Sequence, residues 1–237
     1  MKHLNVLLLC FYVIIVKVIN VKDFEGIIFD MDGVIFDSER AIMECFLEIG
    51  KKYNIKDLDK VYLLCTGVTL EKTKEIILNH YGNDFPYDKY NEEGTKLFFE
   101  KYKDYKLPLK KGVFELMEYL KANNKKIALA SSSPNYLVKK ELEAQGLLKY
   151  FDLIITGDMV LKSKPEPDIY LKAVEKININ PDKLFVIEDS FNGVKSATNA
   201  KLKTIMVPDL KKPDSEMKEK ATVILDDLLK VIEYLNN

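Results

Sequence analysis

The sequence is poor in two residue types that often carry catalysis, histidine and cysteine. It has only two histidines, His3 and His80, so a mechanism that depends on a catalytic histidine has few candidates. Its three cysteines, Cys10, Cys45 and Cys65, form no close pair and no metal-ligand spacing, which argues against disulfides. We expect them to be small residues in or near the core, as suits a reducing cytoplasm.

The sequence also lacks an excess of charge of either sign. Its 36 basic and 37 acidic residues give a formal net charge of −1. This balance gives no reason to expect nucleic acid as a partner, and any basic site for an anionic ligand must be local. With 237 residues, 47% of them hydrophobic, and no internal repeat, the chain suffices for one large α/β domain with a small appendage. We expect a monomer.

The first 20 residues differ from the rest of the chain, because a basic start is followed by an apolar run over residues 6–16. The run resembles the core of a signal peptide, but no small-residue cleavage motif follows it. Lys17 makes it short for a membrane-spanning helix. Three interpretations stay open: translation that starts at Val21, an uncleaved membrane anchor, and an export signal. The first predicts a cytoplasmic protein.

Short apolar runs recur along the remaining chain. They cover residues 27–29, 127–130, 153–155, 184–187, 204–207 and 223–225. Continuous apolar runs bounded by turn residues are typical of parallel strands that are covered on both faces. Helical patterns alternate with them at residues 113–122, 136–145, 168–176 and 192–200. This alternation predicts an α/β fold with an open, doubly wound parallel sheet.

One segment, residues 38–107, breaks the alternation. Apolar residues recur there at helical spacing over residues 40–53, 69–81 and 90–102, with no convincing strand. We predict that 38–107 forms a helical cap domain inserted after the first strand. The α/β core would then consist of residues 21–37 and 108–237, with Pro108 and Gly112 marking the return to the sheet.

Polar residues stand where several predicted strands end. They are Asp30 and Asp32 after the first strand, Ser131, Ser132 and Ser133 after the second, and Glu188 and Asp189 after the fourth. Lys164 lies in a proline-rich turn, "KSKPEPDIY", before the helical pattern that starts at 168. Ligands of open α/β sheets bind outside the carboxyl ends of the strands, so we expect these segments to converge on one crevice.

This set of side chains suits the transfer of a phosphoryl group. The carboxylates of Asp30, Asp32 and Asp189 would repel one another unless a cation lay among them, and carboxylate oxygens suit Mg²⁺. With that cation bound, Lys164 and the Ser131 hydroxyl can hold the oxygens of a phosphate. One aspartate can then attack phosphorus to form an aspartyl-phosphate, while the other protonates the leaving oxygen and later activates water.

Each element of this set also has a simpler explanation. A pair of aspartates after a strand is often a solvated turn. Ser133 could cap a helix that has Pro134 at its first position, and Asp189 or Ser190 could cap the next helix. Lys164 alone would be a surface lysine. Independent caps and turns need not bring this chemistry to one edge of the sheet, so the joint arrangement favours a catalytic site.

Four motifs from about Phe24 to the C-terminus resemble those of the haloacid dehalogenase superfamily. They are "FDMDGVIFDSE", "IALASSS", "KPEPDIY" and "VIEDSFNGV", and they are similar to the branch of β-phosphoglucomutase-like sugar-phosphate phosphatases. The resemblance implies a sheet core with a helical cap between the first two motifs, Mg²⁺ as cofactor, and a small phosphorylated substrate.

The resemblance also implies roles for individual residues. Asp30 would be the nucleophile and Asp32 the acid/base, with its backbone carbonyl on the metal. Ser131, with Ser132 beside it, and Lys164 would bind phosphate. The implied metal site comprises Asp30, Asp32, Glu188 and Asp189.

Three positions depart from the family pattern. Ile42 and Leu70 stand where β-phosphoglucomutase carries a histidine and an arginine, and Lys201 replaces a glycine expected at a left-handed helix end. The first two departures favour a phosphohydrolase over a phosphomutase. The phosphomutase, a phospho-accepting signalling domain of the receiver type and a catalytically silent binding protein are the alternatives.

Overall fold

The computed structural model describes residues 23–66 and 70–237. Its described strands form a six-stranded parallel sheet in the order β3-β2-β1-β4-β5-β6. They are β1 (Gly26–Phe29), β2 (Lys126–Ser131), β3 (Leu153–Thr156), β4 (Leu184–Glu188), β5 (Lys203–Met206) and β6 (Val223–Ile224). Each predicted strand is found within two residues of its expected bounds, so the predicted doubly wound sheet is confirmed.

The strands consist of continuous apolar runs because both faces of the sheet are buried. Ile27 and Phe29 of β1 belong to one hydrophobic cluster, whereas Ile28 between them belongs to the other. Successive side chains of a strand point to opposite faces, so a strand that is covered on both sides needs apolar residues at every position.

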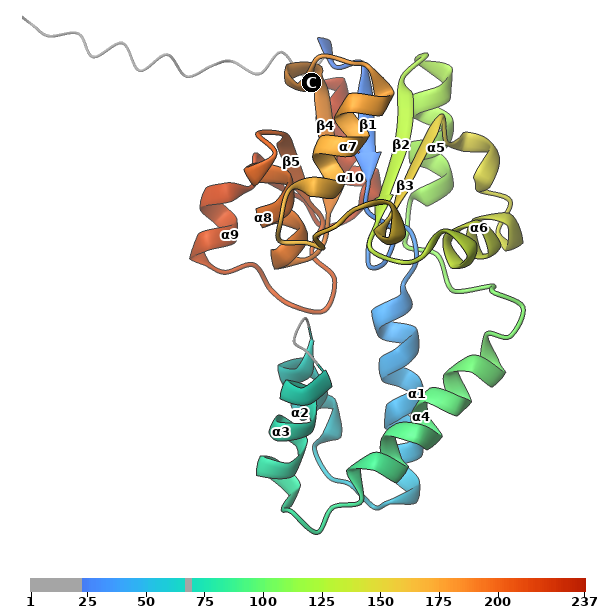
Figure 1. Cartoon of the computed structure of the whole chain (residues 1–237), viewed down its shortest axis with the longest axis vertical. Helices are drawn as coiled ribbons and strands as arrows, with labels where there is room; N and C mark the ends of the chain where they lie inside the picture. Colours follow the sequence, from blue (N-terminus) through green and yellow to red (C-terminus); the bar gives the residue numbers. More distant parts are fainter. Residues whose placement is uncertain (1–22, 67–69) are drawn as a thin grey trace, which may run out of the picture.

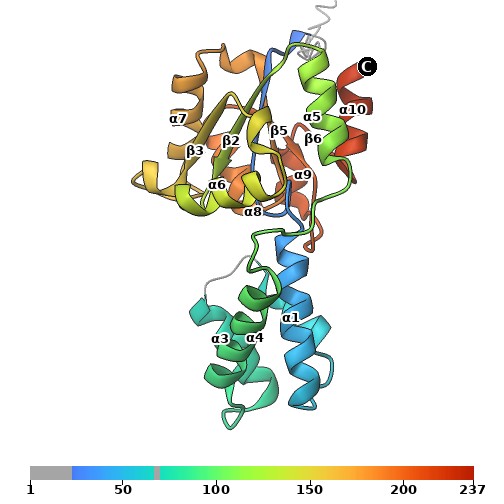
Figure 2. The ribbon, with the colours of Figure 1, turned by 90° about the vertical axis from the view of Figure 1, so that its right-hand side faces the viewer.

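Helices cover the two faces of the sheet (Figure 2). On one side lie α5 (Val113–Ala122), α6 (Asn135–Ala144) and α10 (Leu228–Asn236), and on the other lie α7 (Asp168–Ile177) and α8 (Phe191–Asn199). The short helix α9 (Ser215–Lys220) packs against α8 through Met217 and Val194. Helices α5 to α8 match the predicted helical patterns, whereas α9 and α10 were not predicted.

Four helices follow β1 and lie beyond one end of the sheet (Figure 1). They are α1 (Ser38–Lys52), α2 (Leu58–Cys65), α3 (Leu70–Tyr81) and α4 (Tyr87–Lys101). They surround a hydrophobic cluster of their own, which includes Val61, Ile77 and Tyr90. A helical cap after the first strand is thus confirmed, although α2 was not recognised in the sequence; its bounds, 38–107, stay a prediction.

The chain crosses between core and cap twice, and the two crossings are bonded to each other. Phe36 and Leu109 form an antiparallel bridge. The Asp37 N–H donates to the Pro108 carbonyl at 2.8 Å. Lys110 Nζ lies 3.4 Å from Asp37 Oδ1, which adds an ion pair across the same junction.

The cysteines behave as predicted where the structure describes them. Cys45 and Cys65 are buried free thiols in the cap. Cys10 and the three interpretations of residues 1–20 lie outside the described residues. Within the described part of the chain, no helix is both long enough and apolar enough to cross a membrane.

The end of α8 confirms the expectation for Lys201. This residue has a φ of 63°, in the left-handed region, directly after the helix cap at Ala200. A residue with a β carbon is strained there, which is why glycine is favoured at such helix ends.

Candidate active site

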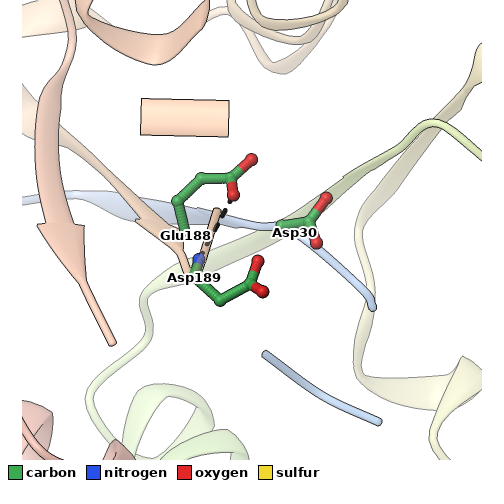
Figure 3. Close-up of side chains that lie close together, drawn as sticks. All are labelled: Asp30, Glu188 and Asp189. Atoms are coloured by element: carbon green, nitrogen blue, oxygen red, sulfur yellow. Dashed lines mark hydrogen bonds between the residues drawn. The ribbon is translucent and has the colours of Figure 1, made fainter. Parts of the chain in front are cut away.

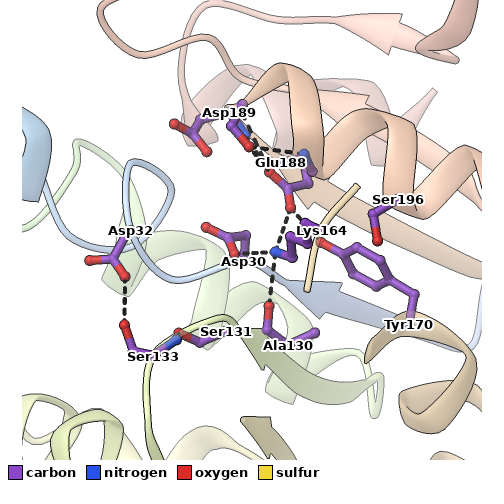
Figure 4. Close-up of polar contacts among 12 residues, drawn as sticks. Asp30, Asp32, Ala130, Ser131, Ser133, Lys164, Tyr170, Glu188, Asp189 and Ser196 are labelled. Atoms are coloured by element: carbon purple, nitrogen blue, oxygen red, sulfur yellow. Dashed lines mark hydrogen bonds and ion pairs between the residues drawn. The ribbon is translucent and has the colours of Figure 1, made fainter. Parts of the chain in front are cut away.

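The sheet brings most of the predicted site residues to one edge. Asp30 follows β1, Ser131 ends β2 and Glu188 ends β4, and β1 pairs with both β2 and β4. Lys164, from the loop between β3 and α7, reaches the same point (Figure 4). The expected convergence of separate segments at the carboxyl ends of the strands is therefore observed.

Lys164 lies at the centre of this edge and is not a surface lysine. Its side chain is only 8% exposed. The Nζ atom donates to Asp30 Oδ1, to Glu188 Oε1 at 2.6 Å and to the Ala130 carbonyl at 3.1 Å. The Tyr170 hydroxyl donates to the same Glu188 oxygen at 2.6 Å. Three donor positions on the ammonium thus have three acceptors.

Among the residues that the structure describes, the carboxylates of Asp30, Glu188 and Asp189 outnumber the ammonium group of Lys164 that is bonded to two of them. Burial raises the pKa of Asp30 to about 8, although Lys164 acts against the shift. Burial, followed by the charges of Glu188 and Asp30, raises the pKa of Asp189 well above its usual range. Burial alone would lower the pKa of Lys164, but the Asp30 and Glu188 carboxylates outweigh it and hold that pKa high. The cluster therefore favours additional positive charge.

Two glycines leave the space that the carboxylates occupy. Gly33 has a φ of +82°, and a β carbon there would lie 2.2 Å from Asp189 Oδ2. A β carbon on Gly193 would lie 1.9 Å from the Glu188 carboxyl carbon. Because real contacts of this kind are never so short, larger residues at either position would displace the acidic groups.

Three carboxylates are placed to hold a metal ion. Asp30, Glu188 and Asp189 each present one oxygen, and these atoms lie within 4.8 Å of one another (Figure 3). Oxygen donors and surplus negative charge fit Mg²⁺. The Asp32 carboxylate is not part of this group, so only the backbone role that the resemblance assigns to Asp32 stays a prediction for metal binding.

Asp32 points away from the Lys164 network (Figure 4). Its Oδ2 atom accepts a hydrogen bond from the Ser133 hydroxyl at 3.3 Å, and burial raises its pKa. The interpretation of Ser133 as a helix cap is wrong, because α6 begins at Asn135 with Pro134 in the cap position and no side-chain cap bond. Ser133 instead orients the Asp32 carboxyl, a contact that the sequence did not reveal.

The other serines near the site differ in their burial and in their hydrogen bonds. Ser131 is buried, and its Oγ accepts from the Ser133 N–H at 3.1 Å, whereas Ser132 is exposed. Ser190 caps α8, as one sequence interpretation held: its Oγ accepts from the Gly193 N–H at 3.0 Å. The Ser190 hydroxyl also donates to Glu188 Oε2 at 3.1 Å, which fixes that carboxylate.

A cavity of about 650 Å³ lies beside Asp32, between α6 of the core and α1 and α4 of the cap. Aromatic residues such as Phe98, Tyr102 and Tyr136 line it, together with the carboxyl groups of Glu39 and Glu141. Neither glutamate was singled out in the sequence. Glu141 had a signal, since it lies three residues after Val138 on the buried face of α6.

The geometry agrees with what comparison with known families shows. The sequence model of the family described as haloacid dehalogenase-like hydrolase matches residues 27–207. That span holds the strand-end aspartates, the serines, Lys164 and the acidic pair after β4. The chain belongs to the haloacid dehalogenase-like hydrolases.

Relatives agree with this assignment. The phosphorylated carbohydrates phosphatase of Thermotoga maritima is 32% identical over 185 residues, 76% of this chain and 83% of the relative. The β-phosphoglucomutase of Bacillus subtilis is 32% identical over 142 residues, 56% of this chain and 61% of the relative. The predicted enzyme class, a phosphatase of this family, is confirmed.

A solved structure shares the fold. The HAD family hydrolase from Deinococcus radiodurans R1, with bound phosphate and sodium, matches with a TM-score of 0.75 at 23% identity. The match covers 90% of this chain and 96% of that one. It supports the sheet core and the position of the cap.

Proposed function

We propose that the protein is a Mg²⁺-dependent phosphohydrolase that acts on a small phosphorylated metabolite such as a sugar phosphate. The observation that carries the proposal is the meeting of Asp30, Glu188 and Asp189 with the buried Lys164 at the carboxyl ends of the strands. Phosphatase relatives support it, among them the phosphorylated carbohydrates phosphatase.

The proposed reaction has two steps. Asp30 attacks phosphorus to form an aspartyl-phosphate, and the bond between phosphorus and the leaving oxygen breaks. Asp32 donates the proton that this oxygen takes up. Asp32 then removes a proton from water, which attacks phosphorus, releases inorganic phosphate and restores the Asp30 carboxylate. The raised pKa of Asp32 suits it to hold a proton before the first step.

The remaining site residues hold the substrate and the cation in this proposal. Ser131, Ser132 and Lys164 would bind the phosphate oxygens. Asp30, Glu188, Asp189 and the backbone carbonyl of Asp32 would hold Mg²⁺. The cation would neutralise the crowded carboxylates and let a phosphate dianion approach them.

The cap, residues 38–107, would close over the core, 21–37 and 108–237, exclude bulk water and choose the substrate. The predictions of a cytoplasmic monomer go with this proposal and rest on the sequence alone.

The alternative is a phosphomutase, which must grip a second phosphate in the cap. Ile42 lines the cavity and cannot donate a hydrogen bond, and Leu70 is 74% exposed at the start of α3. The nearby cap lysines already have partners: Lys74 pairs with Asp88 at 2.7 Å, and Lys72 with Glu75. The two aliphatic positions, Ile42 and Leu70, favour hydrolysis over transfer.

Phosphorus NMR separates these two reactions. With β-glucose 1-phosphate and a priming amount of the bisphosphate, we expect any turnover to release inorganic phosphate. A glucose 6-phosphate signal that grows without matching inorganic phosphate would identify a mutase.

A receiver-like signalling domain would also phosphorylate an aspartate in an α/β sheet. Such a switch must keep its phosphate, whereas Asp32 lies two residues from Asp30 and would speed its loss. The cavity between core and cap also suits a substrate better than a stable phosphoryl group.

The experiment that tests the proposed function measures phosphate release from a panel of phosphorylated metabolites, with Mg²⁺ and with chelator. We expect turnover only with Mg²⁺. Asp30→Asn is the control for contaminating phosphatases, since its amide is nearly isosteric but cannot attack phosphorus. Turnover that Asp30→Asn abolishes but the chelator leaves intact would overturn the Mg²⁺ dependence, and the absence of any Asp30-dependent turnover would overturn the hydrolase.

A further inference from the structure

The cavity beside Asp32 is where the leaving group of the substrate must lie, if the proposed function holds. Asp32 lines this cavity, lies two residues after Asp30, and would protonate the leaving oxygen. The atoms attached to that oxygen therefore extend into a space of about 650 Å³ between the core and the cap. The side chains that line this space select the leaving group.

One of these side chains is buried and incompletely satisfied. Glu141 is only 8% exposed, and its Oε2 atom is buried without a hydrogen-bond partner. A buried carboxyl oxygen without a partner is costly, and native proteins rarely keep one that has no use. When Glu141 is ionised, the missing partner is a hydrogen-bond donor, because a carboxylate only accepts.

A second carboxyl group faces the same cavity from the cap. Glu39 lies in the first turn of α1, and burial, followed by the charges of Asp209 and Asp32, raises its pKa. Burial and the charge of Asp32 likewise raise the pKa of Glu141 to about 7. Glu141 and Glu39 thus converge on the cavity that Asp32 also lines, and each glutamate is destabilised in its charged form.

Positive charge on the described walls of the cavity is scarce. Among the lining residues that the structure describes, Lys103 is the only basic one, and its side chain is exposed. Much of the remaining wall is aromatic, including Phe98 and Tyr102. Aromatic faces attract cations, as carboxylates do. A second anionic group on the substrate would meet repulsion here, whereas a cation would relieve it.

We propose that the natural substrate is a phosphate ester of an amino alcohol, whose protonated amine is bound by Glu141 and Glu39. This inference rests on the proposed phosphatase function and narrows its substrate class. The amine donates to the carboxyl group of Glu141, which lines the cavity, while the ester oxygen lies at Asp32, so one end of the substrate meets the reacting edge and the other meets the glutamates.

The test compares esters that differ in a group away from the phosphate. Glucosamine 6-phosphate and glucose 6-phosphate differ by an amine against a hydroxyl at C2, and 6-phosphogluconate is an open-chain relative with a carboxylate at C1. Phosphoethanolamine, ethylene glycol monophosphate and phosphoglycolate repeat the series on a shorter skeleton. We expect kcat/KM to fall in the order amine, hydroxyl, carboxylate in at least one series. Each step should be about tenfold, the lower end for a hydrogen bond to a charged group.

Single substitutions test whether the cavity residues cause the preference for the amine ester. Glu141→Gln should lower the ratio of kcat/KM for the amine ester to that for the hydroxyl ester by about tenfold. Glu143→Gln is the matched control, because it removes the same charge from the exposed side of the same helix and should leave the ratio unchanged. Glu39→Gln, at a less buried residue, gives the same test if Glu141→Gln does not fold.

The outcomes separate this inference from the function on which it rests. Mg²⁺-dependent hydrolysis of p-nitrophenyl phosphate without an amine preference in either series would overturn the amine proposal and leave the phosphatase in place. An amine preference that Glu141→Gln and Glu39→Gln both leave intact would also overturn it. No hydrolysis of any ester would overturn the proposed function and the inference together.

Discussion

Two regions that meet at Asp32 treat their buried polar groups in opposite ways. At the edge of the sheet, Lys164 has three acceptors, and Glu188 accepts from Lys164, Tyr170 and Ser190. In the cavity under the cap, the buried Oε2 atom of Glu141 has no partner. The first region is complete in the hydrogen bonds of Lys164 and Glu188, although its carboxylates favour additional positive charge, and the second region is incomplete.

The difference separates two tasks of the molecule. A satisfied network fixes side chains before any ligand arrives, as a site for one repeated chemical step requires. A buried carboxyl group without a partner destabilises the free protein, and a ligand that donates a hydrogen bond to it removes this destabilisation. A site that discriminates between ligands can use that difference. The sheet edge would therefore supply the reaction, and the cavity the selection.

The largest loss of activity is expected from substitutions at the sheet edge, where the reaction is proposed to occur. Asp30→Asn should abolish turnover and the acid-labile phosphoryl-enzyme. Asp32→Asn should slow turnover about a hundredfold, the scale of a general acid–base contribution. Steady-state kinetics and acid-quench trapping measure both, with circular dichroism to verify the fold. Near-native activity of Asp30→Asn at saturating Mg²⁺ would show that the sheet edge is not the reacting region.

Removing the Lys164 ammonium group from the sheet edge should lower the free energy of unfolding. Lys164→Met leaves Asp30 and Glu188 as buried carboxylates without their partner, so the free energy of unfolding should fall by about 3 kcal/mol at pH 8. Added Mg²⁺ should restore part of this loss. Urea unfolding measures it, and Lys162→Met, at an exposed lysine two residues earlier, is the control. Equal losses in the two variants would mean that the network stabilises nothing.

Removing the Glu141 carboxyl group from the cavity should raise the free energy of unfolding, the opposite of the effect expected for Lys164→Met. The pKa of Glu141 is raised from 4.5 to about 7 in the folded protein, so folding favours its protonated form. Its contribution is fully present below pH 4.5 and is lost as the pH rises through 7. At pH 8, Glu141→Gln should therefore be more stable than the wild type by about 2 kcal/mol.

This gain should shrink steadily towards pH 5 in urea titrations at several pH values. Glu143→Gln should show no such pH dependence, because that side chain is exposed. A gain that is the same at pH 5 and pH 8 would point to packing and not to the charge of the carboxyl group.

The smallest effect concerns the backbone at the end of α8, just before β5 begins. Lys201→Gly removes the β carbon from a left-handed position and should raise the free energy of unfolding by about 1 kcal/mol. Lys201→Ala keeps the β carbon and should give little of this gain. If alanine stabilises as much as glycine, the lysine charge and not the backbone is the cause.

The sequence predicted the sheet well because of burial on both faces. Strands such as β1 and β4 need apolar residues at every position, and each is followed by an acidic residue that marks the edge. Short helices escaped prediction, since α2 has eight residues and α9 six, too few turns for a clear period.

The contacts within the site were less predictable than its residues. Nothing local to Lys164 shows that it bonds Glu188, because that contact arises only when the loop folds over the sheet. Tyr170 and Glu141 did carry a signal, as polar residues on the buried faces of α7 and α6. A buried hydroxyl or carboxyl on an apolar helix face must find a partner, so such positions merit attention as site residues.

The paired crossings between core and cap limit how the two parts can move. Because Phe36 bridges Leu109 and Asp37 bonds Pro108, the two connecting segments act as one narrow joint instead of two independent tethers. Displacement of the cap then reduces largely to rotation about this joint. The distance between core and cap would change least next to Leu107, near the joint, and most at the opposite side of the cavity. A single angle would thus set how wide a substrate the enzyme admits.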